Sequence, residues 1–149
     1  MSTPPDTTLR IVREFKASLD RVWAVWSDMD RAAEWWGPEG CDTLELQADL
    51  RVGGKYRWRL RTPMGEMTAR GEYREIVPRV RLVYTWHWDD DPQWENHDSL
   101  VTVEFRAKDA KTTELILTHE GLPNKESRDN HVGGWNSALD RLQKQIEHA

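Results

Sequence analysis

The chain has 149 residues and a mass of 17.5 kDa, a length typical of one domain with its own core. Its 26 acidic and 21 basic residues give a formal charge of −5, which argues against nucleic-acid binding, because that depends on basic patches. The single cysteine, Cys41, excludes an internal disulfide and a zinc site made of several thiolates. No run approaches the ~18 apolar residues of a membrane-spanning helix, and no signal peptide is evident, so we expect a cytoplasmic protein without membrane contact.

Apolar periodicity predicts a strand and two short helices in the first quarter of the chain. After a leader expected to be flexible over residues 1–8, residues 9–15 alternate like a half-buried strand, and a single domain is expected to fill 9–149. In residues 18–28 the apolar positions recur every three or four residues, which predicts a helix. A second short helix around Trp35 is expected to end at Gly37.

Five further strands and a long helix are predicted in the rest of the chain. Apolar and polar residues alternate within segments 56–60, 67–73, 82–88, 101–105 and 115–119. Short turns link these segments, so neighbours should pair antiparallel. Helical spacing returns after Pro123 and continues to Ile146. This order predicts an α+β fold in which a curved antiparallel sheet wraps around a long C-terminal α-helix.

Six segments, in this order, resemble those of a known family. They are 35–40 (WWGPEG), 49–54 (DLRVGG), 71–78 (GEYREIVP), 81–86 (RLVYTW), 118–122 (THEGL) and 134–139 (GWNSAL). Over residues 9–146 the chain is similar to bacterial single-domain relatives of the activator of heat-shock protein 90 ATPase. These belong to the helix-grip (START-like, SRPBCC) superfamily, which includes START domains and polyketide cyclases. The resemblance implies a helix-grip fold with a cavity between the sheet and the terminal helix.

The alternation indicates which side chains face this cavity. The chain contains nine Trp but only three Tyr and two Phe, and a cavity lined with indoles would account for the excess. The candidate ligand-binding residues are Trp36, Tyr56, Trp58, Tyr73, Tyr84, Trp86, Trp88, Phe105, Leu117, His119, Trp135 and Leu139. Mostly apolar walls with a few polar groups are typical of small-molecule sites. We therefore expect a small hydrophobic, aromatic ligand, with no cofactor and no metal.

Two histidines and a pair of glycines near the terminal helix allow alternative interpretations. His119 ends an apolar alternation and is either a buried neutral imidazole or a residue that orients a ligand or transfers a proton. His131 lies near the start of the helix, either in solvent or at the cavity mouth. Gly133 and Gly134 lower helix propensity, which indicates close approach of the helix backbone to the sheet or to a ligand.

Two charged segments are expected to be solvated. Residues 87–98 contain His, Asp and Glu, but their spacing fits neither a calcium loop nor a zinc pair, which favours a solvated hairpin loop. Arg57, Arg59 and Arg61 alternate with apolar residues and should face outward.

Three functions remain open from the sequence. The first is binding of a hydrophobic small molecule in the cavity, and the second is a cofactor-free cyclase or hydrolase that uses His119 as general base. The third is a co-chaperone that stimulates a heat-shock protein 90 ATPase, although the eukaryotic activator has a further domain that this sequence lacks. A homodimer is also left open.

Overall fold

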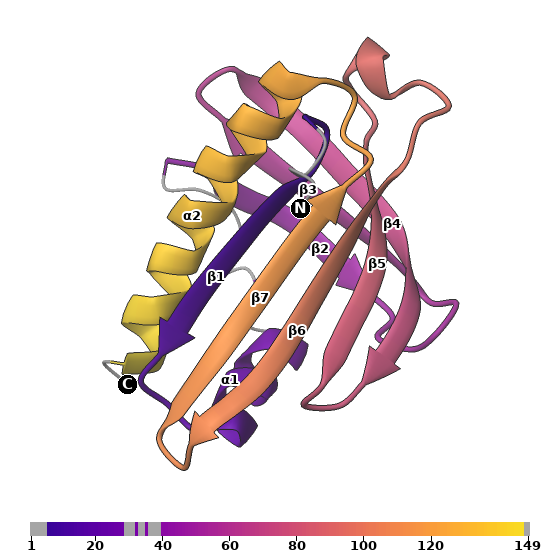
Figure 1. Cartoon of the computed structure of the whole chain (residues 1–149). Helices are drawn as coiled ribbons and strands as arrows, with labels where there is room; N and C mark the ends of the chain where they lie inside the picture. Colours follow the sequence, from indigo (N-terminus) through magenta and orange to yellow (C-terminus); the bar gives the residue numbers. More distant parts are fainter. Residues whose placement is uncertain (1–5, 29–31, 33–34, 36–39, 148–149) are drawn as a thin grey trace.

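Seven antiparallel strands form one curved sheet in the computed structural model, which describes residues 6–28, 32, 35 and 40–147 (Figure 1). The strands are β1 (Leu9–Phe15), β2 (Asp42–Ala48), β3 (Lys55–Thr62), β4 (Gly65–Val77), β5 (Arg81–Trp88), β6 (Ser99–Asp109) and β7 (Thr112–Glu120). The helices are α1 (Leu19–Ser27), the short 3₁₀ helix η2 (Pro92–Trp94) and α2 (Lys125–Glu147). The predicted α+β class and helix-grip architecture are confirmed.

The order of strands across the sheet is β1-β7-β6-β5-β4-β3-β2. Strands β2 to β7 therefore follow one another as hairpins. Strand β1 instead pairs with β7, with Leu9 opposite His119 and Phe15 opposite Thr113. The first strand of the chain thus becomes an edge of the sheet, next to one of the last segments.

Strand β2 is an addition to the predicted strands. Its sequence, DTLELQA, does alternate, but five of its seven residues are only partly buried and it contains no aromatic residue. That alternation over residues 44–48 is the signal that would have identified it. The second short helix predicted around Trp35 falls on a segment of which the structure describes only residues 32 and 35.

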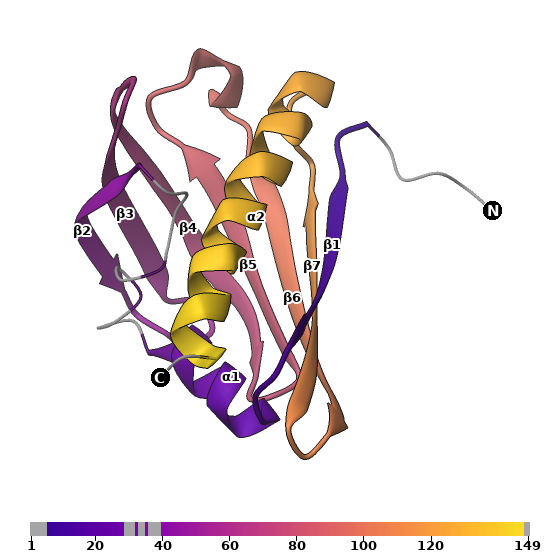
Figure 2. The ribbon, with the colours of Figure 1, turned by 90° about the vertical axis from the view of Figure 1, so that its left-hand side faces the viewer.

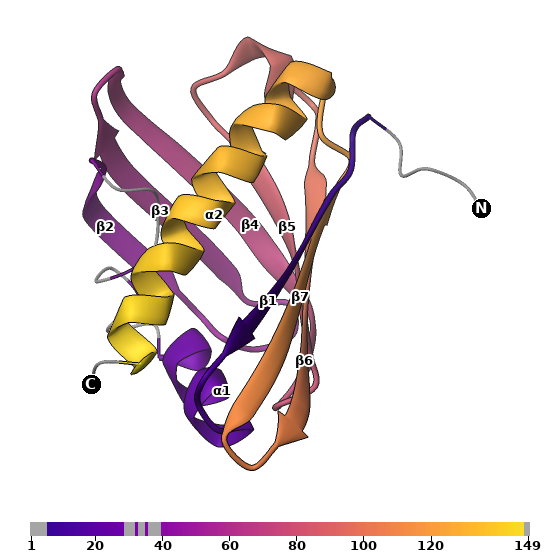
Figure 3. The same cartoon turned by 60° about the vertical axis from the view of Figure 1, so that its left-hand side comes forward.

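The two α-helices lie on the concave side of the sheet (Figures 2 and 3). The Ser18 side chain caps α1 by accepting a hydrogen bond from the Arg21 backbone N–H. Helix α2 crosses the concave face diagonally, and α1 lies at the end of the sheet where α2 finishes. On its exposed side α2 is tied to β1, because Arg13 contacts Asp140 at 2.6 Å and Asn136 at 3.1 Å.

A close approach between two strands is possible only because residue 71 is glycine. A Cβ atom at Gly71 would lie 1.9 Å from the backbone oxygen of Thr85 and 2.7 Å from the Tyr56 ring. The Tyr56 hydroxyl donates a hydrogen bond of 2.5 Å to that same Thr85 oxygen. Gly71 therefore lets β4 accommodate the Tyr56 side chain against β5.

The outer face of the sheet carries ion pairs. The guanidinium of Arg57 lies 3.6 Å from Glu45, and that of Arg59 lies 3.0 Å from Glu66. This agrees with the expected outward orientation of these arginines. None of the described helices is long and apolar enough to cross a membrane.

Candidate functional site

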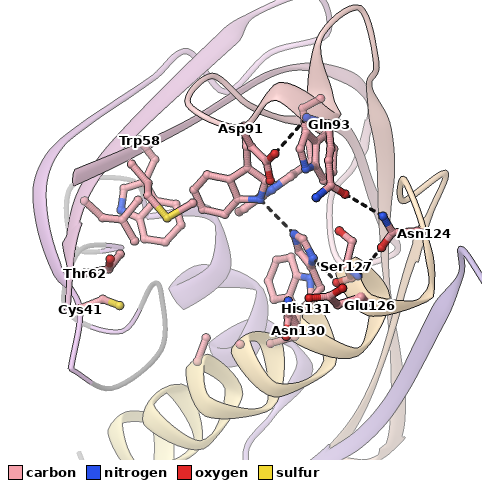
Figure 4. A pocket seen from close by; sticks show the side chains of 18 residues that line it. Cys41, Trp58, Thr62, Asp91, Gln93, Asn124, Glu126, Ser127, Asn130 and His131 are labelled. Atoms are coloured by element: carbon pink, nitrogen blue, oxygen red, sulfur yellow. Dashed lines mark hydrogen bonds between the residues drawn. The ribbon is translucent and has the colours of Figure 1, made fainter. Parts of the chain in front are cut away.

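A pocket of about 290 Å³ lies between the first half of α2 and the strands β3, β4 and β5 (Figure 4). Five of the nine tryptophans line it, namely Trp58, Trp86, Trp88, Trp94 and Trp135. Leu60 and Met67 add apolar surface. The pocket lies towards the end of the sheet opposite α1, where α2 begins.

Trp86 is at the centre of the aromatic wall. Its ring centroid lies 5.5 Å from that of Trp135, 5.6 Å from that of Trp88 and 6.1 Å from that of Trp58. The corresponding interplanar angles are 54°, 76° and 63°. The indoles therefore form inclined walls rather than a stack. The buried N–H of Trp86 has no hydrogen-bond partner among the described residues.

Polar side chains gather at one end of the pocket, whereas Cys41 and Thr62 lie at the other (Figure 4). Asn124 links the two sides of this polar end: its amide nitrogen donates to Gln93 at 2.7 Å. Its side-chain oxygen accepts from the backbone N–H of Ser127 at 2.8 Å and so caps α2. This end of the pocket is thus held together by polar contacts between η2 and α2.

The segment between β5 and β6 contributes more than a solvated loop. Trp94 is only 1% exposed, and its indole forms part of the pocket wall. The Asp91 side chain accepts a hydrogen bond from the Gln93 backbone N–H at 3.0 Å, and that of Asp90 accepts one from the Thr68 backbone at 2.8 Å. Most of this loop is solvent-exposed, as expected, but the prediction missed that Trp94 is buried and that Asp91 caps the short helix carrying it.

His131 lies at the polar end and is held as a neutral imidazole. The Trp88 indole N–H donates to His131 Nε2 at 3.0 Å, so the proton of the ring is on Nδ1, which donates to the Ser127 carbonyl at 2.7 Å. Burial lowers the pKa of His131, although the Ser127 bond and the charge of Asp91 oppose this effect. A second proton, on Nε2 of His131, would point at the indole N–H of Trp88 and break the hydrogen bond between them.

His119 lies behind the pocket wall in a similar arrangement. The Trp135 indole N–H donates to His119 Nδ1 at 3.1 Å, so Nε2 carries the proton and donates to the Ser99 hydroxyl at 2.7 Å. The Ser99 hydroxyl in turn donates to the Trp86 carbonyl at 2.9 Å. His119 is fully buried, and this burial, together with the nearby His131, lowers its pKa well below the ordinary value. Both ring nitrogens are thus engaged with protein groups.

The structure divides the candidate ligand-binding residues into two groups. Four line the pocket: Trp58, Trp86, Trp88 and Trp135. Seven lie outside its lining: Tyr56, Tyr73, Tyr84, Phe105, Leu117, His119 and Leu139. Trp36 lies outside the described residues.

The three tyrosines form an aromatic cluster in the core that adjoins the pocket wall, since the ring centroid of Tyr56 lies 6.3 Å from that of Trp86. The ring centroids of the tyrosines lie 5.6–5.9 Å apart. Burial and, to a smaller extent, the charge of Asp49 raise the pKa of Tyr73 to about 12, and burial also raises the pKa of Tyr56 and Tyr84. The hydroxyl of Tyr84 has no hydrogen-bond partner among the described residues. All three phenols are therefore neutral.

The glycine pair of α2 does not reflect a close approach to the sheet. A Cβ atom at Gly133 or Gly134 would meet no described atom within 4 Å. Gly134 lines the pocket, whereas Gly133 does not. Of the two alternatives, close approach to the sheet is therefore wrong, whereas close approach to a ligand stays a prediction, at Gly134.

Some lining residues were not identified from the sequence. Trp94, Asp91 and Gln93 come from the loop that was interpreted as solvated, and Glu126 from the first turn of α2. The Asp-Pro-Gln-Trp segment, in which an acid precedes proline, carries a helix-start signal that would have indicated an ordered turn. In the described part of the chain no cluster of three or more His, Cys, Asp or Glu side chains could hold a metal ion.

Comparison with known proteins identifies the family. The profile of the family described as "Activator of Hsp90 ATPase homolog 1-like protein" matches residues 16–147. A crystal structure from Chromobacterium violaceum is similar, with 30% identity and a TM-score of 0.81, covering 95% of this chain and 97% of that one. The AHSA1 protein from Silicibacter pomeroyi has 28% identity and a TM-score of 0.81, covering 94% and 97%.

DynU16, a protein of the dynemicin biosynthetic locus, shares the fold at 23% identity and a TM-score of 0.75. The match covers 96% of this chain and 48% of that one. No curated protein matches the sequence. Because the profile extends over most of the chain and the architecture agrees, the chain belongs to the family of Activator of Hsp90 ATPase homolog 1-like proteins.

Proposed function

We propose that the protein binds a hydrophobic, aromatic small molecule in the pocket between the sheet and α2. The observation that carries this proposal is the convergence of five indoles from β3, β5, η2 and α2 on one space. A concave space with mostly apolar, aromatic walls and a few polar groups is the usual form of a small-molecule site. The pocket's 290 Å³ is at the lower end of the usual range for ligand sites and suits a molecule of one or two rings.

The hydrogen bonds of the two histidines favour binding over proton-transfer catalysis. A general base needs a free lone pair within reach of the substrate. His119 has none, because Nδ1 accepts from Trp135, and His131 has none, because Nε2 accepts from Trp88. We propose that they position the indoles of the wall instead.

The adjacent glycines of α2 provide a direct test. Gly134→Leu would place a side chain in the pocket, whereas Gly133→Leu adds the same atoms at a position that does not line it. We expect a planar aromatic compound such as naphthalene, quinoline or indole to bind the wild type and Gly133→Leu alike in calorimetric titrations. Affinity for Gly134→Leu should fall by about ten-fold or more, with Gly134→Ala between them.

Thermal melts of the three variants would verify that each is folded. Failure of every compound in the panel to bind the wild type would overturn the proposal. So would wild-type affinity in a folded Gly134→Leu variant, because the ligand would then lie elsewhere.

A further inference from the structure

The charged side chains of the pocket are all of one sign. Asp91 and Glu126 line it, and none of its described lining residues is Lys or Arg. His131 is the remaining titratable base of the lining, and its bonds to Trp88 and Ser127 hold it neutral. A ligand in this pocket therefore meets negative charge without a compensating cation from the wall.

These two carboxylates also differ from the acids on the outer face of the sheet. There, acids are paired with arginines, as Glu66 is with Arg59 at 3.0 Å. Neither Asp91 nor Glu126 forms an ion pair within the described part of the chain. Among the described residues, Asp91 accepts a hydrogen bond through Oδ1 alone, from the Gln93 backbone N–H, so Oδ2 is available to a ligand.

The indoles add a second attraction for positive charge. The face of an aromatic ring carries negative electrostatic potential, and Trp attracts cations most strongly. Trp58, Trp86 and Trp88 meet at angles of 45–76°, an arrangement of inclined walls that can surround a compact cationic group. Figure 4 places Asp91, Glu126 and His131 at the same end of the pocket.

Two positively charged features near the pocket do not cancel the negative charge of Asp91 and Glu126. The positive end of the α2 dipole lies near the polar end, but Asn124 already caps it and Glu126 occupies its first turn. Arg141 is close enough to lower the pKa of the Cys41 thiol, which burial raises more strongly. Cys41 is at the other end of the pocket, away from the carboxylates.

We infer that the ligand of this pocket is an organic cation, in which an ammonium or quaternary ammonium group is attached to an aromatic or similarly planar apolar body. This inference rests on the proposed binding function and specifies its ligand class. The apolar body lies among the indoles, and the cationic group lies at the end where Asp91 and Glu126 project. Carboxylate ligands of the same shape are disfavoured, because the carboxylates of Asp91 and Glu126 would repel them.

Three compounds with one naphthalene body would test the charge preference. They are 2-naphthylmethylamine as the cation, 2-naphthalenemethanol as the neutral analogue and 2-naphthoate as the anion. In calorimetric titrations at about pH 7.5, where the amine is protonated, we expect the amine to bind at least about ten-fold more tightly than the alcohol. The carboxylate should bind most weakly.

Variants that each remove one carboxylate would test whether Asp91 and Glu126 cause the preference for the amine. Asp91→Asn keeps an oxygen that can cap Gln93, and Glu126→Gln keeps the size of the side chain. Each should lower the affinity for the amine several-fold and change that for the alcohol by less than about two-fold. Asp109→Asn is the matched control. Asp109 also caps a backbone N–H, that of Lys111, but lies in the β6–β7 hairpin at the opposite end of the sheet (Figure 1).

The outcomes separate the two proposals. If the alcohol or the carboxylate binds as tightly as the amine, the cation preference is overturned while the binding function stands. If none of the three binds, both proposals fall. An amine preference that persists in Asp91→Asn and Glu126→Gln, or that is lost equally in Asp109→Asn, would also overturn the assignment.

Discussion

The indole of Trp135 donates a hydrogen bond of 3.1 Å to Nδ1 of His119, and this bond determines which nitrogen of the buried imidazole carries the proton. The same relationship recurs between Trp88 and His131. The two imidazoles meet edge to face with their centroids 5.2 Å apart. Two tryptophans of the pocket wall are thus oriented by two neutral, neighbouring histidines, and a proton on either ring would disturb that orientation.

Stability should decrease with acidification below the ordinary histidine pKa. Burial lowers the pKa of both His119 and His131 in the folded protein, whereas the unfolded chain takes up protons near 6.5. Between these pKa values the unfolded state binds more protons. The free energy of unfolding should therefore be highest above about pH 6.5 and fall below it, by at most about 1.4 kcal/mol per pH unit for each histidine.

Urea denaturation of the wild type from pH 8 to pH 5 would measure this dependence. The double variant His119→Gln/His131→Gln lacks both titrating rings and should show a smaller slope between pH 7 and pH 5. Equal slopes in the two proteins would contradict the assignment to these histidines.

Adding one methyl group should have opposite effects at two glycines. Gly71→Ala would force a Cβ atom against the Thr85 backbone oxygen, so we expect a loss of about 2 kcal/mol or more in the free energy of unfolding. Gly133→Ala adds the same atoms to an open helix position and should stabilise by about 1 kcal/mol. Chemical denaturation of both variants beside the wild type checks the pair. Equal stabilities would show that β4 and β5 relax freely around residue 71.

His119→Gln distinguishes a binding protein from an enzyme. If the protein only binds its ligand, the affinity for a naphthalene compound should change within a few-fold, because His119 acts on the pocket only through its bond to Trp135, and a glutamine oxygen can accept that bond. An enzyme that used this imidazole as its base would lose turnover by about 10²-fold or more. Calorimetry together with product analysis after incubation with candidate esters and polyketide-like substrates would separate the two. Turnover by the wild type that His119→Gln abolishes would favour the enzyme.

We expect no stimulation of a heat-shock protein 90 ATPase. The proposed function depends on a pocket, and the outward arginines Arg57 and Arg59 already face acids on neighbouring strands. Adding this protein to the ATPase of the same organism should leave the rate of ATP hydrolysis unchanged within error. Stimulation at stoichiometric concentration that disappears in Arg57→Glu/Arg59→Glu would instead indicate a co-chaperone, since these arginines lie on the outer face of the sheet, away from the pocket.

The sheet was largely predictable because one alternating pattern recurs in strand after strand. In β3, Tyr56, Trp58 and Leu60 are buried and their arginine neighbours face outward or are only partly covered. Strand β2 is harder to identify, because Leu44 and Leu46 alternate over a short segment that carries no aromatic residue, and in the structure they are only partly buried. Alternation thus identifies strands most readily where it is long and marked by large buried side chains.

The pocket was predictable only in part, because facing the helix is different from lining an open space. Tyr84 and Trp86 are on the same face of β5, yet only Trp86 lines the pocket. The position at which α2 crosses the sheet decides which inward residues line the pocket and which pack in the core. No local sequence pattern specifies this position. Trp94 is buried in the wall because Asp91 caps the short helix η2 that carries it. The acidic composition of this loop does not reveal that arrangement.

The position of β1 at the edge beside β7 has a consequence for synthesis on the ribosome. Leu9 finds its partner His119 only after more than a hundred further residues have been made, and Arg13 waits still longer for Asp140. Hairpins β2 to β7 can form as they emerge, but β1 cannot pair until β7 has been made, and the concave face stays uncovered until α2 follows. Contacts between residues so distant in sequence form slowly. During that interval the apolar side of β1 has no partner in the nascent chain and is open to non-native contacts.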